Sequence, residues 1–290
     1  MKRILITLLA MLVALIGYAA IAAWRSPPVF EIESPSVEFP LMSWDDYQNV
    51  ARSVTPPVID QRDIGDGAVL IFGAEHRSDP DHPQFAALDA AYAAFDPDVV
   101  LVEGRMGFLL GSVMDPIRIF GESGAMAAKA KRDGRALYTW EMCRTCEPEQ
   151  LAERFSDRQV ALFLLLRPYS GSDDTTRAAG QERISQIIAD RRSRPGIEGV
   201  IGSLDDFEAA WEAEFQGQAG WHTLRGVYGA PGFLHDMFEY ANDIRDQNLL
   251  NIICELTDDG QRVMATVGWS HAVRIAPALR MMAEDTETGD

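Results

Sequence analysis

The chain is poor in positive charge relative to negative charge. Its 290 residues include 26 Lys and Arg but 44 Asp and Glu, which gives a formal net charge of -18. Binding to nucleic acid needs a basic surface that neutralises phosphates, and charge-driven binding to anionic lipid needs one too. The composition therefore argues against both, and we expect no nucleic-acid partner.

Cysteine is also scarce, with three residues in the whole chain. Cys143 and Cys146 form one CxxC pair, and there is no second pair to complete a Cys-rich zinc site. Glu147 follows the pair at the place where a haem-attachment motif has His. Two interpretations stay open: a pair of ordinary thiols, or a local disulfide or redox pair in an oxidising compartment.

Charged residues are absent from an apolar run near the N-terminus, Ile4 to Trp24, which follows Lys2 and Arg3. A membrane-spanning helix takes about 20 apolar residues, so the run is long enough. The positive charges before it predict an N-terminus in the cytoplasm and export of the rest. We expect residues 1–25 to anchor the protein in a membrane, with the remainder facing the periplasm or the extracellular side.

A cleaved signal peptide is the main alternative for this run, because Ala20-Ile21-Ala22 resembles a cleavage site. The run is long for the apolar region of a signal peptide, which favours the anchor. A buried helix of a soluble domain fits less well, because the run carries no polar face. The anchor and the signal peptide both predict an exported domain.

The pattern of apolar runs after the N-terminal segment predicts an α/β domain at residues 63–283. Apolar runs rich in β-branched residues predict four strands, at 68–72, 98–103, 136–140 and 263–267. Apolar residues at helical spacing lie between the first two runs, which makes a βαβ unit with parallel strands. We therefore expect a mainly parallel central sheet flanked by helices.

Three segments lie outside the predicted sheet and its helices. Residues 26–62 are rich in Pro and are expected to be linker and lead-in, with one short helix around Trp44–Val54. Residues 148–232 carry more charge and are predicted to be a helical insertion between the third and the last core strands. Residues 284–290 form an acidic tail that we expect to be disordered.

Two of the five histidines stand in the same context. Gly73-Ala74-Glu75-His76 follows the first predicted strand, and Gly268-Trp269-Ser270-His271 follows the last. Glycine permits a sharp turn, and the carboxyl ends of parallel strands share the edge where α/β sheets place their sites. We expect His76 and His271 to meet there. A single Gly-x-x-His is a weak signal, because such a histidine often only caps a helix or binds a carbonyl.

Other polar residues are predicted to join the histidines. Two further strands end in the carboxylates Glu103 and Glu141, and Arg105 follows soon after Glu103. Arg245 and Asn248 fall on the apolar stripe of the longest predicted helix, where a buried arginine needs a partner or a ligand. The alternative for Glu103 and Arg105 is a simple ion pair at a strand end.

These residue types suit a catalytic metal. Imidazole and carboxylate ligands bind Zn, Mn, Fe or Co, and a catalytic site needs about three protein ligands and an open position. We assign the ligand role to His76, His271 and Glu103. The candidates for general base, for support of an oxyanion or for substrate binding are Glu75, Glu103, Glu141, Arg105, Arg245 and Asn248.

In these residues the sequence resembles the TraB/TIKI (PrgY/GumN-like) family, within a superfamily that includes erythromycin-esterase-like and ChaN-like proteins. The resemblance rests on Gly73–His76, Glu103, Gly268–His271 and the Arg245-x-x-Asn248 pair, in the family's order. In the TIKI branch the two histidine motifs are implicated in a divalent-metal protease. The resemblance therefore implies that His76 and His271 are metal ligands or catalytic residues, with Glu103 beside them.

Two features depart from the TraB-like pattern. Ala74 stands where TraB-like sequences usually have Thr, and the His76-x5-His82 loop resembles ChaN-like proteins, which are associated with haem or iron. Three functions therefore compete. The first is a metal-dependent hydrolase of peptide or ester bonds that uses Mn, Co or Zn. The second is a non-catalytic protein that binds haem, iron or a peptide. The third is an inert scaffold that keeps the site residues as an ion-pair network.

Overall fold

The computed structural model describes residues 13, 17, 23–34, 36–107, 109–110, 114–169, 176–217, 220–224 and 230–288. The chain divides into two compact units, one formed by residues 1–141 and 246–290 and the other by residues 142–245. The expected membrane segment lies mostly outside the described residues. Within the described ranges, no helix is both long enough and apolar enough to cross a membrane.

The first unit contains a five-stranded sheet with the order β2-β3-β7-β4-β6. Four of its strands are parallel neighbours: β3 (Gly67–Ala74), β7 (Arg262–Gly268), β4 (Val99–Val102) and β6 (Ala136–Thr139). The fifth strand, β2 (Val58–Ile64), is an antiparallel hairpin partner of β3. The prediction of a mainly parallel sheet is therefore confirmed. The sheet also has one antiparallel edge strand that was not predicted. A separate two-residue pairing joins β1 (Ala23–Trp24) to β5 (Leu109–Leu110).

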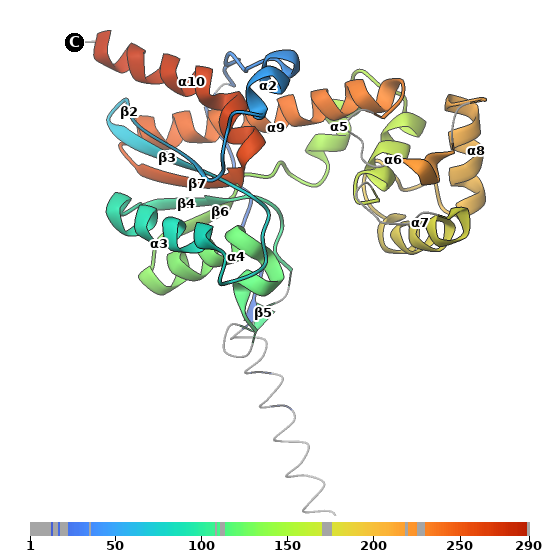
Figure 1. Cartoon of the computed structure of the whole chain (residues 1–290), viewed down its shortest axis with the longest axis horizontal. Helices are drawn as coiled ribbons and strands as arrows, with labels where there is room; N and C mark the ends of the chain where they lie inside the picture. Colours follow the sequence, from blue (N-terminus) through green and yellow to red (C-terminus); the bar gives the residue numbers. More distant parts are fainter. Residues whose placement is uncertain are drawn as a thin grey trace, which may run out of the picture. The chain divides into compact units, whose positions relative to one another are not determined.

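Helices cover both faces of the sheet, as predicted (Figure 1). Alternate residues of the central strands point to opposite faces. Leu70 and Phe72 of β3 pack with α3 (Pro83–Phe95) and α4 (Pro116–Asp133). Val69 and Ile71 pack on the other side, with α10 (Trp269–Thr288) and the part of α9 (Phe233–Asp258) from Asp246 onward. Burial on both faces explains why these strands are continuous apolar runs in the sequence.

The lead-in contains the predicted short helix, α2 (Trp44–Ala51). It also contains most of β2, which was not predicted. Phe39 is buried, and its backbone N–H and C=O bond to the side chain of Gln247. Strand β2 lies at the sheet edge and alternates half-buried and exposed residues up to the buried Ile64; the paired Asp60 and Arg62 are both half-buried. Its apolar content is too low to form the continuous run that marks a fully buried strand.

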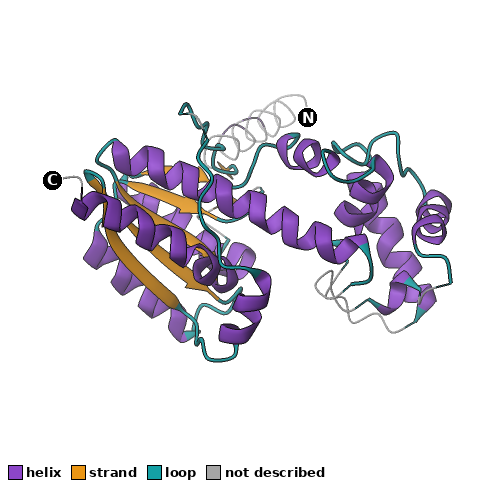
Figure 2. Cartoon of the chain, turned by 90° about the horizontal axis from the view of Figure 1, so that it is seen from above, coloured by secondary structure: helices purple, strands orange, loops and turns teal. Residues whose placement is uncertain are grey.

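The second unit is helical in its described part (Figure 2). Its helices are α5 (Cys146–Ala152), α6 (Asp157–Leu166), α7 (Arg177–Arg191), α8 (Leu204–Glu214), the short 3-10 helix η1 (Trp221–Thr223) and the beginning of α9. They enclose a core of their own, which includes Phe163, Ile184 and Trp211. The helical character agrees with the sequence, but the unit begins and ends outside the predicted range of 148–232.

The C-terminal helix α10 includes His271 and much of the expected disordered tail. It begins at Trp269, immediately after β7, so that His271 lies in its first turn rather than in a loop. It also continues through Thr288, where we expected a disordered tail from Glu284. Met281, Met282 and Ala283 are good helix formers and lead the helix into the acidic segment.

Gly73 provides a test of the packing between β3 and α10. A Cβ added to Gly73 would lie 2.6 Å from the Cβ of Ala272 and 3.1 Å from the Cα of Trp269. We expect Gly73→Ala to lower the free energy of unfolding by about 1–3 kcal/mol, because the extra methyl overpacks this contact. Urea denaturation of the two proteins measures the difference.

Gly107→Ala is the matched control, because a Cβ there meets no atom within 4 Å. Its effect should stay within about 0.5 kcal/mol, as for a surface change away from special features. Equal stabilities of the two alanine variants would contradict the close contact between β3 and α10.

Candidate functional site

The site lies where the carboxyl ends of β3, β7 and β4 meet. Parallel register places Ala74 opposite Gly268, so the two Gly-x-x-His segments leave the sheet side by side. His76 follows β3 in a loop, Glu103 follows β4 directly, and His271 lies in the first turn of α10. This edge is where open α/β sheets usually place ligands.

Glu103 lies between the two histidine segments. Its Oε2 accepts a 2.6 Å hydrogen bond from the backbone N–H of Gly268. Its Oε1 lies 3.9 Å from Nε2 of His271. The backbone carbonyl of Glu103 also accepts a hydrogen bond from the hydroxyl of Ser123, 2.8 Å away. One carboxylate oxygen is therefore held by the backbone, and the other faces an imidazole.

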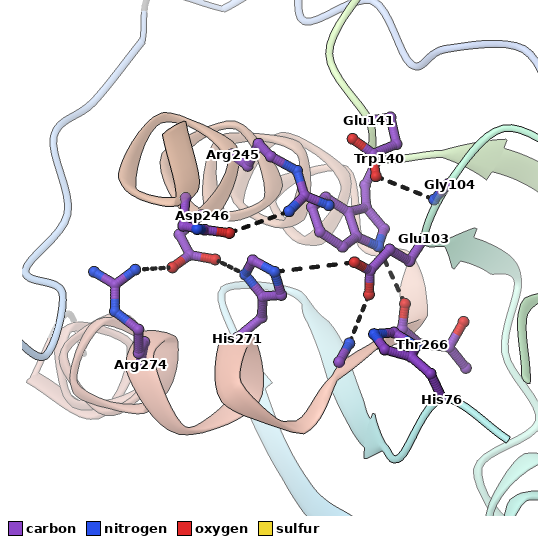
Figure 3. A network of polar contacts seen from close by, with 12 residues as sticks. His76, Glu103, Gly104, Trp140, Glu141, Arg245, Asp246, Thr266, His271 and Arg274 are labelled. Atoms are coloured by element: carbon purple, nitrogen blue, oxygen red, sulfur yellow. Dashed lines mark hydrogen bonds and ion pairs between the residues drawn. The ribbon is translucent and has the colours of Figure 1, made fainter. Parts of the chain in front are cut away.

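His271 is almost fully buried and is held from its far side by a carboxylate. Its Nδ1 lies 2.5 Å from Oδ1 of Asp246, and Oδ2 of Asp246 accepts a 2.9 Å hydrogen bond from Nη1 of Arg274. The Trp140 ring packs edge-on against the imidazole, with 5.5 Å between ring centroids. Figure 3 shows His271 between Asp246 and Glu103, with its two ring nitrogens facing the two carboxylates.

His76 has the same kind of support but a different exposure. Its Nδ1 lies 2.7 Å from Oε1 of Glu122, and the side chain of His76 is 68% exposed whereas that of Glu122 is 5% exposed. Glu122 follows a break in α4 at Gly121, where φ is +55°. A Cβ on Gly121 would lie 2.8 Å from the carbonyl oxygen of Arg77, so glycine allows α4 to approach the His76 loop.

Because Gly268 has no side chain, there is a small space between its backbone and the side chains of His76 and Glu103. A Cβ added to Gly268 would lie 3.1 Å from Nε2 of His76 and 3.6 Å from Oε2 of Glu103. Both atoms therefore line the same small volume beside the Gly268 backbone. On the other side of the same carboxylate lies Nε2 of His271. Oε1 of Glu103 thus faces His271, and Oε2 shares the space beside Gly268 with Nε2 of His76.

The hydrogen bonds to Nδ1 determine whether each Nε2 atom carries a hydrogen or a lone pair. An ionised carboxylate only accepts, so Glu122 and Asp246 each take the Nδ1 hydrogen of a neutral imidazole. The Nε2 lone pair of His271 then faces Glu103, which is itself an acceptor, and the Nε2 lone pair of His76 lies beside Gly268. Such a group of acceptors favours a cation among them. Within the described parts of the chain, no group of three or more His, Cys, Asp or Glu side chains is placed to hold a metal ion.

Two other predicted residues support the edge of the sheet. Oε1 of Glu141 accepts a 3.2 Å hydrogen bond from the N–H of Gly104, which fixes the turn after β4. Nδ2 of Asn248 donates to the carbonyl of Trp140 at 2.7 Å, which holds the end of β6 to α9. Their described contacts are with the backbone, one step away from the histidines.

The remaining predicted residues lie in the loops after β3 and β4, at the start of α3 and on α9. The Glu75 carboxylate pairs with Arg77 at 2.8 Å in the exposed loop. Arg105 is exposed in the turn that follows β4. Arg245 is the last residue of the second unit and donates to Oδ1 of Asn242 at 3.3 Å. His82, the other histidine of the first loop, caps the N-terminus of α3.

Sequence reasoning missed Glu122, Asp246 and Arg274. Asp246 had a weak signal, because it adjoins Arg245 on the helix already singled out. Arg274 also had one, because it follows His271 by three residues and therefore shares a helix face with it. Glu122 lies in a segment without any motif, and only the contact with His76 identifies it.

The cysteines do not supply a nucleophile to this site. Cys143 and Cys146 form a disulfide, so the interpretation as two ordinary thiols is replaced by the local disulfide. The third, Cys254, lies on α9 with its Sγ 3.7 Å from Oδ2 of Asp258. Burial raises the pKa of the Cys254 thiol, and the neighbouring Asp258 carboxylate raises it further. At neutral pH it remains a thiol.

An open sheet that is mostly parallel hosts many unrelated functions, so the fold alone does not define this one. Comparison with known proteins finds no matching family model, no matching curated protein and no matching solved structure. The chemistry of this sheet edge is therefore inferred from its own side chains.

Thiol labelling tests the state of the three cysteines. Without reductant, native protein should release about one equivalent of thionitrobenzoate from Ellman's reagent, slowly at pH 7 and faster as the pH rises, because Cys254 has a raised pKa. Cys254→Ser should release none. Three reactive thiols in unreduced wild-type protein would contradict the disulfide.

Proposed function

We propose that the protein is an exported, metal-dependent hydrolase that cleaves a peptide or ester bond at the carboxyl edge of its sheet. The observation that carries the proposal is the gathering of three donors at one edge: Nε2 of His271 lies 3.9 Å from Oε1 of Glu103, and Nε2 of His76 and Oε2 of Glu103 border the same space beside Gly268. Each imidazole has its Nδ1 on a buried carboxylate, Glu122 or Asp246. Imidazole backed by carboxylate is the usual arrangement of a metal-binding histidine.

The donor set fits a divalent ion of the Mn, Co or Zn type. His76, His271 and Glu103 would hold it, since two nitrogen ligands and one oxygen ligand suit these metals. The small volume beside Gly268 supports this assignment, because a single Cβ there would fill it. The exposed side of His76 leaves room for the open position that a catalytic site needs.

The residues around this position would have different roles in the reaction. When bound, a divalent ion of this type supplies Lewis acidity, which activates water and polarises a carbonyl group. Gly268 fixes Oε2 of Glu103, and Oε1 lies on the side of His271, where it would act as a ligand or accept a proton from water. His271 is fixed deep in the site, whereas His76 borders the solvent from which substrate arrives.

Export is proposed from the N-terminal apolar run, with a membrane-anchored protein that faces the periplasm or the extracellular side. The Cys143–Cys146 disulfide supports an oxidising compartment. The acidic composition makes nucleic acid an unsuitable substrate, so we propose a peptide or another small molecule. The resemblance to the TIKI branch of the TraB/TIKI family agrees with a metal-dependent hydrolase.

Metal analysis tests this proposal. Purified wild-type protein, loaded with Mn²⁺, Co²⁺ or Zn²⁺ and then desalted, should retain about one ion per chain. His76→Ala should retain much less because it removes a ligand. Gly268→Ala should do the same because its Cβ occupies the space between His76 and Glu103. Hydrolysis of peptide and ester substrates by the loaded protein should fall in parallel.

His235→Ala is the matched control, because His235 lies in the second unit, where its Nε2 is 3.3 Å from Oε1 of Glu239. It should keep the wild-type metal content. Equal metal content in all four proteins would reject the metal site. A haem absorbance band without hydrolysis would favour the haem- or iron-binding alternative instead.

A further inference from the structure

We infer that Asp246, oriented by Arg274, is a positioning residue that keeps the His271 proton on Nδ1 and so presents the Nε2 lone pair to Glu103. The inference deepens the proposed function, on which it rests for the use of that lone pair. The tautomer itself is a property of the metal-free chain. It can therefore be tested whether or not metal binds.

Burial makes this network different from a surface ion pair. Asp246 is 0% exposed, Arg274 is 1% exposed and His271 is 7% exposed. A charge at such depth is costly, so each group needs partners that satisfy it. Asp246 has two partners on its two oxygens, Arg274 on Oδ2 and His271 on Oδ1. A plain structural ion pair would need only the first.

The chemistry of the three groups fixes the direction of each hydrogen bond. A guanidinium only donates, so Oδ2 of Asp246 accepts from Arg274. An ionised carboxylate only accepts, so Oδ1 takes a hydrogen from Nδ1 of His271. A neutral imidazole has one hydrogen on its nitrogens, which leaves Nε2 as an acceptor. That Nε2 is the atom that lies 3.9 Å from Glu103.

Arg274 is itself held in place from the lead-in segment. Its guanidinium lies over the Trp44 ring, 4.1 Å from the ring centroid, and its Nε donates to the carbonyl of Met42 at 3.3 Å. The N–H of Met42 in turn donates to the carbonyl of Arg274 at 2.9 Å. The guanidinium therefore has few alternative positions, and its donors stay directed at Asp246.

Replacement of Asp246 by Asn should reverse the tautomer. The amide has one acceptor, its oxygen, and one donor group, its NH₂. Arg274 can only donate, so the amide oxygen must turn toward Arg274 and the NH₂ toward His271. Nδ1 of His271 must then accept, and its hydrogen moves to Nε2. The variant keeps the shape of the side chain but turns a donor toward Glu103.

The experiment is long-range ¹H–¹⁵N correlation NMR of the histidine rings in metal-free full-length protein, at a pH where the rings are neutral. Wild-type His271, assigned by loss of its signals in His271→Gln, should show the Nδ1–H tautomer. Asp246→Asn should show the Nε2–H tautomer. An Nε2–H tautomer in wild type, or an unchanged Nδ1–H tautomer in folded Asp246→Asn, would overturn the inference.

Asp258→Asn is the matched control, because it makes the same change on the same helix at an exposed position. It should keep the wild-type His271 tautomer, and a reversed tautomer there would also overturn the inference. If Asp246→Asn fails to fold, which circular dichroism detects, the wild-type tautomer alone decides the outcome.

Metal titration separates this inference from the proposed function. Folded Asp246→Asn should bind the divalent ion about 10–100-fold more weakly than wild type, as for loss of a carboxylate behind a histidine ligand. Unchanged affinity would reject the positioning role. No metal binding by wild type would reject the proposed function, whereas the NMR result would still decide the tautomer.

Discussion

A carboxylate that is buried away from water needs hydrogen-bond donors on both of its oxygens, and the position of His271 depends on that requirement. Asp246 is completely buried on α9, and its two oxygens take hydrogens from α10, at Arg274 and at His271. Arg274 extends the network to the lead-in through Met42 and Trp44. Because α10 starts directly after β7, the same helix that satisfies Asp246 also places His271 opposite Glu103 at the sheet edge.

The two Gly-x-x-His segments look alike but use their glycines differently. Gly73 lies inside β3 and lets α10 pack against the strand, since a Cβ there would meet Ala272. Gly268 lies at the end of β7, where its N–H binds Glu103 and its missing side chain leaves space beside His76. The first glycine serves the packing of the core, and the second serves the site.

The histidines that follow are equally unlike. His271 is fixed within a helix and buried beside Trp140, whereas His76 lies in a loop with most of its side chain in solvent. Each still has a carboxylate on Nδ1, from helices on opposite faces of the sheet: Asp246 on α9 and Glu122 on α4. A site assembled in this way has one wall fixed by the core and one wall open to a ligand.

The sequence alone determined the four parallel strands of the central sheet and pointed to His76, Glu103 and His271, because buried parallel strands are continuous apolar runs and their polar ends stand out. Strand β2 escaped detection because four consecutive polar residues, Asp60 to Asp63, occupy its middle. Only the tertiary structure placed β7 between β3 and β4 and brought Glu122, Asp246 and Arg274 to the histidines. The partner of a buried polar group depends on how distant helices pack, and local sequence carries no record of that packing.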